Sequence, residues 1–332
     1  MPNCILEAKD IRKTFLFKGA LVVVLNKLQF SIREGQFVSI VGPSGCGKST
    51  FLELLAGITK PDNGNIYLEG NEITGKTGFL GYMPQDDLLF PWLTTIQNIL
   101  LPVKVQGKDE KEARKKIIEL LPLFGLMNYT DHLPYQLSGG LKQRVALLRT
   151  YMSSAEILLL DEPLAKLDAL TRSQLQTWLK DIVHLLNLTV ILVTHDIDEA
   201  IMLSDRIDLM SINPGTFMES IYLDRNAPLN AEEQLKLKTK IRSKLVNGEE
   251  KSENGFSEKG NIRADLVIGE YDFNGSLVIP VDFTESFKQY MKADIDVNID
   301  KNNKVLGFES DAIGTSIIVS RPVEDIRHGS YY

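Results

Sequence analysis

The feature that most constrains the fold is a glycine-rich segment, Gly42-Pro43-Ser44-Gly45-Cys46-Gly47-Lys48-Ser49-Thr50, set between two apolar segments. Residues 37–41 before it predict a buried strand, and residues 51–56 after it predict a helix. Glycines let successive backbone N–H groups turn inward around phosphate oxygens, and a helix start favours negative charge. The order strand, loop, helix therefore predicts an α/β fold with a phosphate-binding loop.

Two side chains of this loop have predictable roles. Lys48 is placed to neutralise the outer phosphates of a nucleotide, and Ser49 can offer its hydroxyl to a magnesium ion. A second glycine-rich stretch, Leu137-Ser138-Gly139-Gly140, also opens onto an expected helix, whose unpaired N–H groups offer another anion site.

An apolar run at residues 157–160 ends in Asp161 and Glu162. A buried parallel strand has this composition, and its carboxyl end is where ligands bind in open α/β sheets. We expect Asp161 to hold magnesium through water and Glu162 to act as a general base toward the attacking water. The alternative is a capping pair before a helix. His195 follows another apolar run, so it too lies at an expected strand end within reach of a γ-phosphate, although a purely structural histidine is the alternative.

These residues, in this order, resemble the nucleotide-binding subunits of ABC transporters over residues 4–225. The matching motifs are the Walker A loop Gly42–Thr50, the Q-loop glutamine Gln85, the signature Leu137–Val145, the Walker B strand Leu158–Glu162, the D-loop Leu164–Asp168 and the switch histidine His195.

The resemblance implies an α/β fold, namely a P-loop NTPase cassette with a mixed sheet core, an antiparallel β edge and a helical subdomain. It implies that ATP and Mg²⁺ are the cofactors, and that the Ser138 loop of one subunit covers the ATP held by another. The pair would be a homodimer or a dimer with a similar cassette. The nucleotide-binding residues would be Phe15, Gly42, Pro43, Ser44, Gly45, Cys46, Gly47, Lys48, Ser49, Thr50, Gln85, Ser138, Gly139, Gly140 and Asp168. The catalytic residues would be Glu162, His195, Lys48 and Gln85, and the metal would be held by Ser49, Gln85 and Asp161.

Three positions depart from the family pattern or stay ambiguous. Leu141 stands where the commonest signature has glutamine, and Lys166 stands where the D-loop usually has a small residue. Lys166 could pair with an acidic group across the dimer seam or point to solvent, and we expect solvent because isolated surface ion pairs contribute little. Phe15 matches the adenine-stacking aromatic of the family, with Phe17 close enough to compete.

The charge and the apolar runs limit the cellular context. A formal net charge of −7 argues against a nucleic-acid partner. The amino terminus lacks a signal pattern, and no apolar run approaches the ~20 residues that span a bilayer. Two cysteines, Cys4 and Cys46, suit a reducing compartment. We therefore expect a cytoplasmic protein that reaches the inner face of the membrane through a partner.

The segment Asp87-Leu88-Leu89-Phe90-Pro91-Trp92-Leu93 indicates that partner. In the family, a groove beside the Q-loop receives a cytoplasmic helix of the membrane permease, although Trp92 could instead pack within the helical subdomain. Details of the sequence resemble importers of nitrate, sulfonates or taurine, which also use an extracytoplasmic solute-binding protein. The alternative is a non-transport ABC ATPase, such as a DNA-repair or translation factor.

The domain boundaries follow from where the resemblance ends. We expect a cassette over 1–228 with a helical subdomain at about 90–153, a helix and polar linker over 229–261, and a small α+β domain over 262–332. Asn230 to Glu233 predicts a helix start with a partial capping box. In the last part we expect strands at 266–268, 276–279 and 316–319 and a helix at 284–293. This part has no recognisable motif, and its role could be regulatory, dimer-stabilising or passive.

Overall fold

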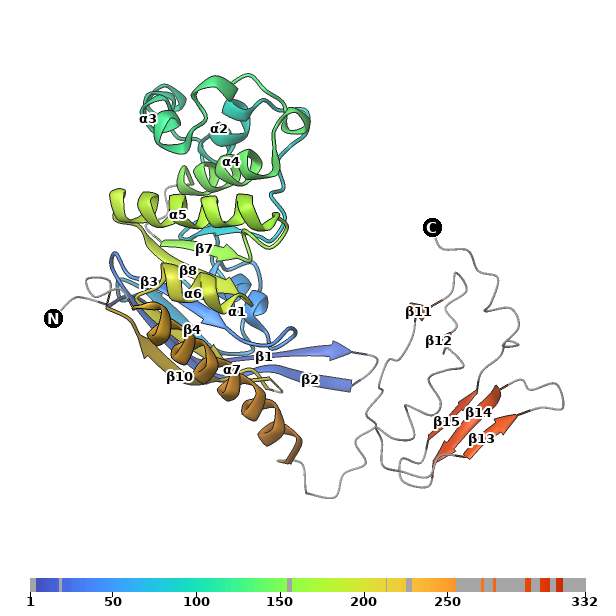
Figure 1. Cartoon of the computed structure of the whole chain (residues 1–332). Helices are drawn as coiled ribbons and strands as arrows, with labels where there is room; N and C mark the ends of the chain where they lie inside the picture. Colours follow the sequence, from blue (N-terminus) through green and yellow to red (C-terminus); the bar gives the residue numbers. More distant parts are fainter. Residues whose placement is uncertain are drawn as a thin grey trace. The chain divides into compact units, whose positions relative to one another are not determined.

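The computed structural model describes residues 4–17, 20–153, 157–212, 214–224 and 229–254, and beyond these it describes five short strands. The chain divides into two compact units, Met1–Phe256 and Ser257–Tyr332. The first unit contains every candidate site residue named above (Figure 1).

A six-stranded sheet forms the centre of the first unit, with the strand order β10-β9-β3-β8-β7-β6. These strands are β3 (Phe37–Val41), β6 (Gly81–Met83), β7 (Ile157–Asp161), β8 (Thr189–Thr194), β9 (Arg206–Met210) and β10 (Phe217–Tyr222). Strand β10 runs antiparallel to β9, and the remaining pairs are parallel. Every residue of β3, β7, β8 and β9 is buried, as expected for parallel strands covered on both faces. The predicted mixed sheet is confirmed.

A second, antiparallel sheet has the order β2-β1-β4-β5. Its strands are β1 (Cys4–Phe17), β2 (Ala20–Arg33), β4 (Asn63–Leu68) and β5 (Asn71–Glu72). Helix α1 (Lys48–Leu55) is joined to both sheets by aromatic packing. The Phe51 ring on α1 lies 5.5 Å from the Phe30 ring of β2 and 5.7 Å from the Phe217 ring of β10, measured between centroids. Helix α1 is therefore held against both sheets by the ring of Phe51, three residues after Lys48.

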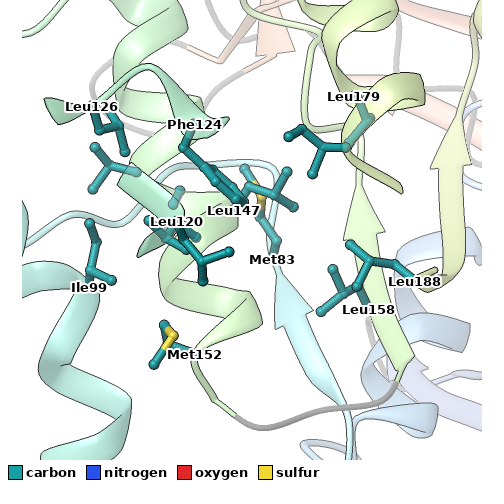
Figure 2. Packing of buried hydrophobic residues seen from close by; sticks show 14 of the residues in the cluster. Met83, Ile99, Leu120, Phe124, Leu126, Leu147, Met152, Leu158, Leu179 and Leu188 are labelled. Carbon is teal, nitrogen blue, oxygen red and sulfur yellow. The ribbon is translucent and has the colours of Figure 1, made fainter. Parts of the chain in front are cut away.

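The helical subdomain contains α2 (Thr95–Val105), α3 (Glu110–Phe124), two short 3₁₀ turns, η1 (Met127–Tyr129) and η2 (Pro134–Gln136), and α4 (Gly139–Tyr151). Figure 1 shows α2, α3 and α4 grouped at one end of the cassette, beyond α5 (Ala169–Leu185). One buried cluster joins these helices to the sheet (Figure 2): Phe124 of α3, Leu147 of α4 and Met83 of β6 belong to it. The subdomain is thus anchored on the strands that lead to the candidate site.

Two helices lie beside β9. Helix α6 (Ile197–Leu203) follows β8, and α7 (Ala231–Asn254) follows residue 230. The buried Ile241 of α7 packs in a cluster with Ala200 of α6 and with β9. The amide of Glu233 donates to Asn230 Oδ1 at 3.0 Å and the amide of Asn230 donates to Glu233 Oε2 at 2.9 Å, so the expected capping box is present.

The second unit contains two small antiparallel sheets among its described residues. Their strands are β11 (Glu270–Tyr271), β12 (Leu277–Val278), β13 (Asp296–Ile299), β14 (Val305–Ser310) and β15 (Thr315–Ile318). The predicted strands at 276–279 and 316–319 overlap β12 and β15, whereas the predicted strand at 266–268 and helix at 284–293 lie outside the described residues. Within the described parts of the chain, no helix combines the length and apolar character needed to cross a bilayer.

Arg206 joins the two sheets of the first unit. Its guanidinium pairs with Asp208 Oδ2 at 2.9 Å within β9 and donates to the carbonyl oxygen of Ser31 in β2 at 2.7 Å. Both side chains of the pair are buried. Burial raises the pKa of Asp208 above its ordinary value of 3.8, although Arg206 and Ser220 lower it. Folding therefore keeps a proton on this carboxyl to a higher pH than unfolding does, so this group's contribution to stability falls as pH rises through that window.

Replacing Arg206 by methionine leaves Asp208 buried without its cation, and only the hydrogen bond from the Ser220 hydroxyl remains among the partners named above. We expect Arg206→Met to lower the free energy of unfolding near neutral pH by about 3–5 kcal/mol, measured by urea denaturation. The loss should shrink in mild acid, because a protonated Asp208 needs no cation, and the double variant Arg206→Met/Asp208→Asn should recover part of it. Arg242→Met, at an exposed position on α7, is the matched control. Equal losses at both pH values would show that the pair does not carry the effect.

Candidate functional site

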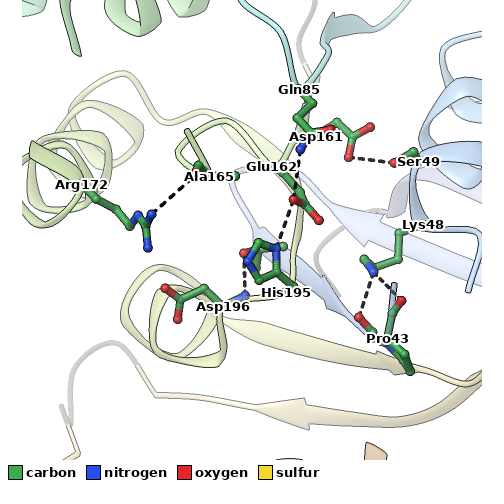
Figure 3. Close-up of polar contacts among 12 residues, drawn as sticks. Pro43, Lys48, Ser49, Gln85, Asp161, Glu162, Ala165, Arg172, His195 and Asp196 are labelled. Carbon is green, nitrogen blue, oxygen red and sulfur yellow. Dashed lines mark hydrogen bonds and ion pairs between the residues drawn. The ribbon is translucent and has the colours of Figure 1, made fainter. Parts of the chain in front are cut away.

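The glycine-rich loop connects β3 to α1, and Lys48 is the first residue of that helix. The Lys48 ammonium donates to the carbonyl oxygens of Gly42 and Pro43, at 2.8 Å each (Figure 3). The Lys48 side chain is buried, so its charge is held inside the loop by backbone dipoles. The side chains of Ser44 and Ser49 are exposed beside it, and Pro43 and Thr50 are half-buried. A cation, exposed hydroxyls and a helix N-terminus thus meet at one point, which suits a polyanion.

Two glycines of this loop have no room for a side chain. Gly47 has a φ of 99°, and a Cβ there would lie 2.6 Å from Leu25 Cδ2 and 3.0 Å from Val24 Cγ1. A Cβ on Gly42 would lie 2.7 Å from the carbonyl oxygen of Met210. Gly45 has a φ of 79° and nothing within 4 Å of its ideal Cβ. Packing therefore excludes a side chain at Gly42 and Gly47, and the positive φ of Gly45 and Gly47 favours glycine at both positions.

Cys46 lies inside the loop but does not face outward. Its side chain is buried, and burial raises the pKa of its thiol above the ordinary value of 9.0 while Lys48 lowers it. The thiol is therefore protonated at neutral pH and packs among apolar residues of the core that joins both sheets. Cys46 belongs to the phosphate loop through its backbone position.

Asp161 ends β7 and lies beside the loop. Its Oδ1 accepts a hydrogen bond from the Ser49 hydroxyl at 3.1 Å, and its Oδ2 lies 3.5 Å from the hydroxyl of Tyr82. The pKa of Asp161 is raised, chiefly by burial, while its hydrogen bond with Ser49 lowers it. Tyr82 was missed in the sequence, although its position three residues before Gln85 placed it near the site. Burial and the Asp161 charge raise the pKa of the Tyr82 phenol, so it stays a hydrogen-bond donor.

Glu162 is the point where three strand ends meet. Its Oε2 lies 3.1 Å from His195 Nδ1 and 3.4 Å from Gln85 Nε2 (Figure 3). His195 follows β8, Glu162 follows β7 and Gln85 follows β6, and these three strands are neighbours in the sheet. The structure thus brings together three residues that are separated by up to 110 positions in the sequence. Glu162 and His195 were expected at strand ends, whereas Gln85 was assigned only through the family resemblance.

The backbone of Glu162 is itself unusual. Its φ is 44°, a left-handed conformation that costs about 1–3 kcal/mol for a residue other than glycine. The Glu162 amide donates to the carbonyl oxygen of Val193 at 2.9 Å, which holds this turn against β8. The alternative that Asp161 and Glu162 form a capping pair is wrong, because Asp168 caps α5, accepting from the amide of Thr171 at 3.0 Å. That hydrogen bond is also the main cause that lowers the pKa of Asp168.

The second glycine-rich segment lies apart from the loop within one chain. The Ser138 hydroxyl caps α4 by accepting from the amide of Leu141 at 3.4 Å. Ideal Cβ atoms on Gly139 and Gly140 would lie 3.1 Å from side-chain atoms of Leu167 and Thr171, so this segment packs against the start of α5. No hydrogen bond among the described residues joins Ser138, Gly139 or Gly140 to residues 42–50. One chain therefore presents two separate anion-suited surfaces.

The two positions left open in the sequence are both exposed. Phe15 and Phe17 lie near the end of β1, 41% and 61% exposed, and the Lys13 ammonium lies 5.3 Å from the centre of the Phe15 ring. Lys166 is exposed as expected but forms an ion pair with Asp86 of the same chain, a partner that was not predicted. This pair lies directly beside Gln85.

The segment after Gln85 exposes apolar side chains on a rigid backbone. Leu88 and Trp92 are 59% and 68% exposed, so packing of Trp92 into the helical subdomain is excluded. The buried Asn98 side chain accepts from the amide of Phe90 and donates to the carbonyls of Phe90, Leu93 and Thr94. Arg149 donates to the carbonyl oxygens of Asp87 and Leu88 at 2.6 and 2.7 Å. Neither Asn98 nor Arg149 was singled out in the sequence. Arg149 contacts residues that are 61 and 62 positions away, and Asn98 is a buried residue inside helix α2.

Gly47→Ala tests whether the loop depends on this close packing. The added methyl group must displace Leu25 or Val24, so the loop should shift and its affinity for ATP should fall by about tenfold or more, which corresponds to at least 1.4 kcal/mol. Titration with a fluorescent ATP analogue measures this. Gly70→Ala is the matched control, because Gly70 has a φ of 79° but open space around its Cβ. An unchanged affinity in Gly47→Ala would contradict the geometry.

Comparison with known proteins agrees with this arrangement. The family model described as ABC transporter matches residues 25–165. The chain is 39% identical to an uncharacterized ABC transporter ATP-binding protein of Methanocaldococcus jannaschii, over 67% of this chain and 84% of that protein. It is 37% identical to the nitrate import ATP-binding protein NrtD of Synechocystis sp., over 70% and 88%. It is 39% identical to the aliphatic sulfonates import ATP-binding protein SsuB of Bacillus thuringiensis subsp. konkukian, over 72% and 95%.

Two solved structures of one bacterial ABC transporter cassette, both dimeric, match with a TM-score of 0.58 at 31% identity, covering 66% of this chain and 99% of theirs. One of them is a post-hydrolysis state bound to ADP and Pi. The predicted cassette fold is therefore confirmed. The chain belongs to the ATP-binding proteins of the ABC transporter family and is an ATPase.

Proposed function

We propose that the chain powers import of a small solute, such as nitrate, a sulfonate, taurine or a related compound, through a separate membrane permease. The observation that carries the ATPase part is the meeting of Gln85, Glu162 and His195 at three adjacent strand ends beside the glycine-rich loop. The names of relatives that import nitrate or sulfonates support the solute class. In this proposal the protein is peripheral on the cytoplasmic face of the membrane.

ATP binds with its phosphates on the glycine-rich loop. The amides of residues 42–50 surround the phosphate oxygens, and Lys48 moves from its own carbonyl partners to the outer phosphates. Phe15, exposed near the end of β1, stacks on adenine, and Phe17 is the other candidate. This role needs an exposed aromatic face, which both residues have.

The residues beside the loop also fit a magnesium ion. Mg²⁺ prefers oxygen ligands, and the Ser49 hydroxyl lies 3.1 Å from Asp161 Oδ1. We assign Ser49, Asp161 and the side-chain oxygen of Gln85 to the metal, with Asp161 acting through water. A bound magnesium ion would neutralise charge on the β- and γ-phosphates.

Glu162 supplies the general base. Its carboxylate accepts a proton from the attacking water as the water oxygen bonds to the γ-phosphorus and the bond to the ADP oxygen breaks, yielding ADP and phosphate. His195 orients Glu162 and the γ-phosphate, since its Nδ1 already contacts the Glu162 carboxylate. The Glu162 carboxylate contacts His195 and Gln85 from a left-handed backbone position directly after β7.

A second subunit completes each site. Ser138, Gly139 and Gly140 of one chain cover the ATP held by the other chain, and Asp168 lies at the same seam. This explains why one chain presents two anion-suited surfaces that do not meet. The dimeric state of the matched cassette structures supports the same arrangement, in a homodimer or with a similar cassette. Closure excludes water from the phosphates and assembles the site only when both halves are present.

The segment 87–93 is the surface for the permease. Leu88, Phe90 and Trp92 expose an apolar face, and the rings of Phe90 and Trp92 pack edge to face at 5.3 Å. Because Asn98 and Arg149 hold the backbone, this face can receive an amphipathic helix with little ordering cost. An extracytoplasmic solute-binding protein would deliver the solute to the permease. In this proposal the cassette is 1–228, the segment 229–261 packs on it through Ile241 of α7, and 262–332 is a further domain.

Glu162→Gln tests the assigned chemistry. Glutamine keeps the shape but cannot accept the proton, so hydrolysis should fall by about 10²–10⁴-fold while ATP binding persists. The trapped ATP should hold two chains together, at twice the 37.3 kDa mass of one chain in light scattering. Glu34→Gln, at an exposed turn, is the control and should hydrolyse ATP normally. Normal turnover in Glu162→Gln would remove Glu162 from its role.

Affinity purification from detergent-solubilised membranes tests the transport assignment. A multi-span permease should be retained, and Trp92→Ala should weaken its affinity by about 30-fold, as expected for a buried interface anchor. Leu185→Ala, an exposed apolar position on α5, should retain the permease fully. Recovery with ribosomes or DNA-repair assemblies and no permease would overturn the importer assignment.

A further inference from the structure

A small polar cavity lies behind the Glu162–His195 pair. It is bordered by Glu162, Ala165, Arg172, His195 and Glu199, and its volume of about 10 Å³ has room for about one water molecule. Figure 3 shows Arg172 reaching toward Ala165 on one side, with Asp196 and His195 on the other. The cavity therefore separates the D-loop residues 164–168 from the residues that follow β8.

Arg172 holds the D-loop from α5. Its Nη2 donates to the carbonyl oxygen of Leu167 at 2.8 Å and to that of Ala165 at 3.3 Å. Its Nε is buried and has no hydrogen-bond partner among the described residues. A buried donor without a partner costs about 1–3 kcal/mol, so its retention calls for an explanation beyond stability.

Glu199 faces the same cavity from α6, four residues after His195. Its side chain is 4% exposed, and its Oε1 has no partner within the described part of the chain. Burial raises the pKa of Glu199, and the Asp196 charge raises it further. Thr194, Gln176 and the Arg172 cation act in the opposite direction. The carboxyl therefore shares the cavity with the Arg172 side chain, next to the strand end that carries His195.

The D-loop and β8 are also tied to each other through the backbone of Glu162. The Ala165 amide donates to the carbonyl oxygen of Glu162 at 3.2 Å, and the Glu162 amide donates to the carbonyl oxygen of Val193 in β8 at 2.9 Å. A shift of the D-loop therefore changes both the turn at Glu162 and the charge that faces Glu199. The D-loop begins at Leu164, two residues after Glu162, so only a short stretch of chain separates the D-loop from Glu162.

We propose that Arg172 and Glu199 are positioning residues that couple the D-loop to His195. When the second subunit presses on the D-loop, Arg172 moves with the carbonyls of Ala165 and Leu167 and draws Glu199 and α6, and His195 aligns on Glu162. Hydrolysis in one site thereby depends on contact with the other chain. This inference rests on the proposed dimeric ATPase and adds the residues that transmit assembly to the catalytic pair.

Steady-state hydrolysis by the full-length protein tests the coupling. Arg172→Met keeps the aliphatic stem, and Glu199→Gln keeps the shape of the carboxyl. Each should lower kcat by about 10- to 100-fold, the cost of a small misplacement of reacting groups, with the Kd for ATP within about twofold of wild type. The double variant should be no slower than the slower single variant, because both changes break one connection. Lys180→Met and Asp181→Asn, exposed on α5, are matched charge controls and should behave as wild type.

A loss of ATP binding would mean that the two residues only maintain the fold. An unchanged kcat in the single variants, or a double variant whose loss of kcat is the product of the two single losses, would overturn the coupling. If Arg172→Met does not fold, as judged by circular dichroism, Arg172→Lys replaces it, with a lowered kcat at unchanged Kd expected and an unchanged kcat contradicting the coupling. Failure of the proposed function is distinguishable, because the wild-type chain would then not hydrolyse ATP or Glu162→Gln would turn over normally.

Discussion

The parallel pairing of β6, β7 and β8 is the constraint on which the site depends. Asp161 lies opposite Val193 in this ladder, and Met83 lies opposite Leu160, so the three strands end at one edge. Because parallel strands end in the same direction, Gln85, Glu162 and His195 leave the sheet side by side and meet at one carboxylate oxygen. A one-residue slip would direct these residues to the opposite faces of the sheet. The complete burial of β7 and β8 stabilises that register.

The site carries local costs that the surrounding core offsets. Glu162 has a left-handed backbone, and Asp161 is a buried carboxylate with a raised pKa. Arg172 and Glu199 each leave a buried polar atom without a partner among the described residues. Around them, the aromatic packing of Phe51 and the buried cluster that includes Phe124 fix α1 and the helical subdomain. The proposed site of ATP chemistry therefore combines backbone strain at Glu162 with unpartnered buried atoms, and a well-packed core lies next to it.

The sequence predicted the parts that local patterns determine. The strand–loop–helix order around Lys48 and the apolar runs before Asp161 and His195 predicted elements and edges correctly, because a buried parallel strand and a glycine loop have recognisable composition. The cassette fold followed from those motifs in order. The roles assigned to individual site residues stay predictions until they are measured.

Other features depended on contacts that no local pattern reveals. Arg149 supports Leu88 across 61 positions, and Arg206 reaches Ser31 across 175. Lys166 pairs with Asp86 of its own chain, 80 positions away. The left-handed φ of Glu162 depends on the Val193 carbonyl, and the exposure of Trp92 depends on how Asn98 folds the preceding segment. Such contacts become visible only once the strands and helices are assembled in space.

The central claim is that one chain's glycine-rich loop and another chain's Ser138 segment form one ATP site. It is tested most directly by mixing two variants that both carry Glu162→Gln, one with Lys48→Ala and the other with Ser138→Arg. With ATP, each alone should stay at the single-chain mass of 37.3 kDa, because both of its sites would be damaged. The mixture should form a two-chain complex that holds one ATP, in the single intact site. A two-chain complex with two ATP molecules formed by the Ser138→Arg variant alone, or no complex in the mixture, would contradict the account.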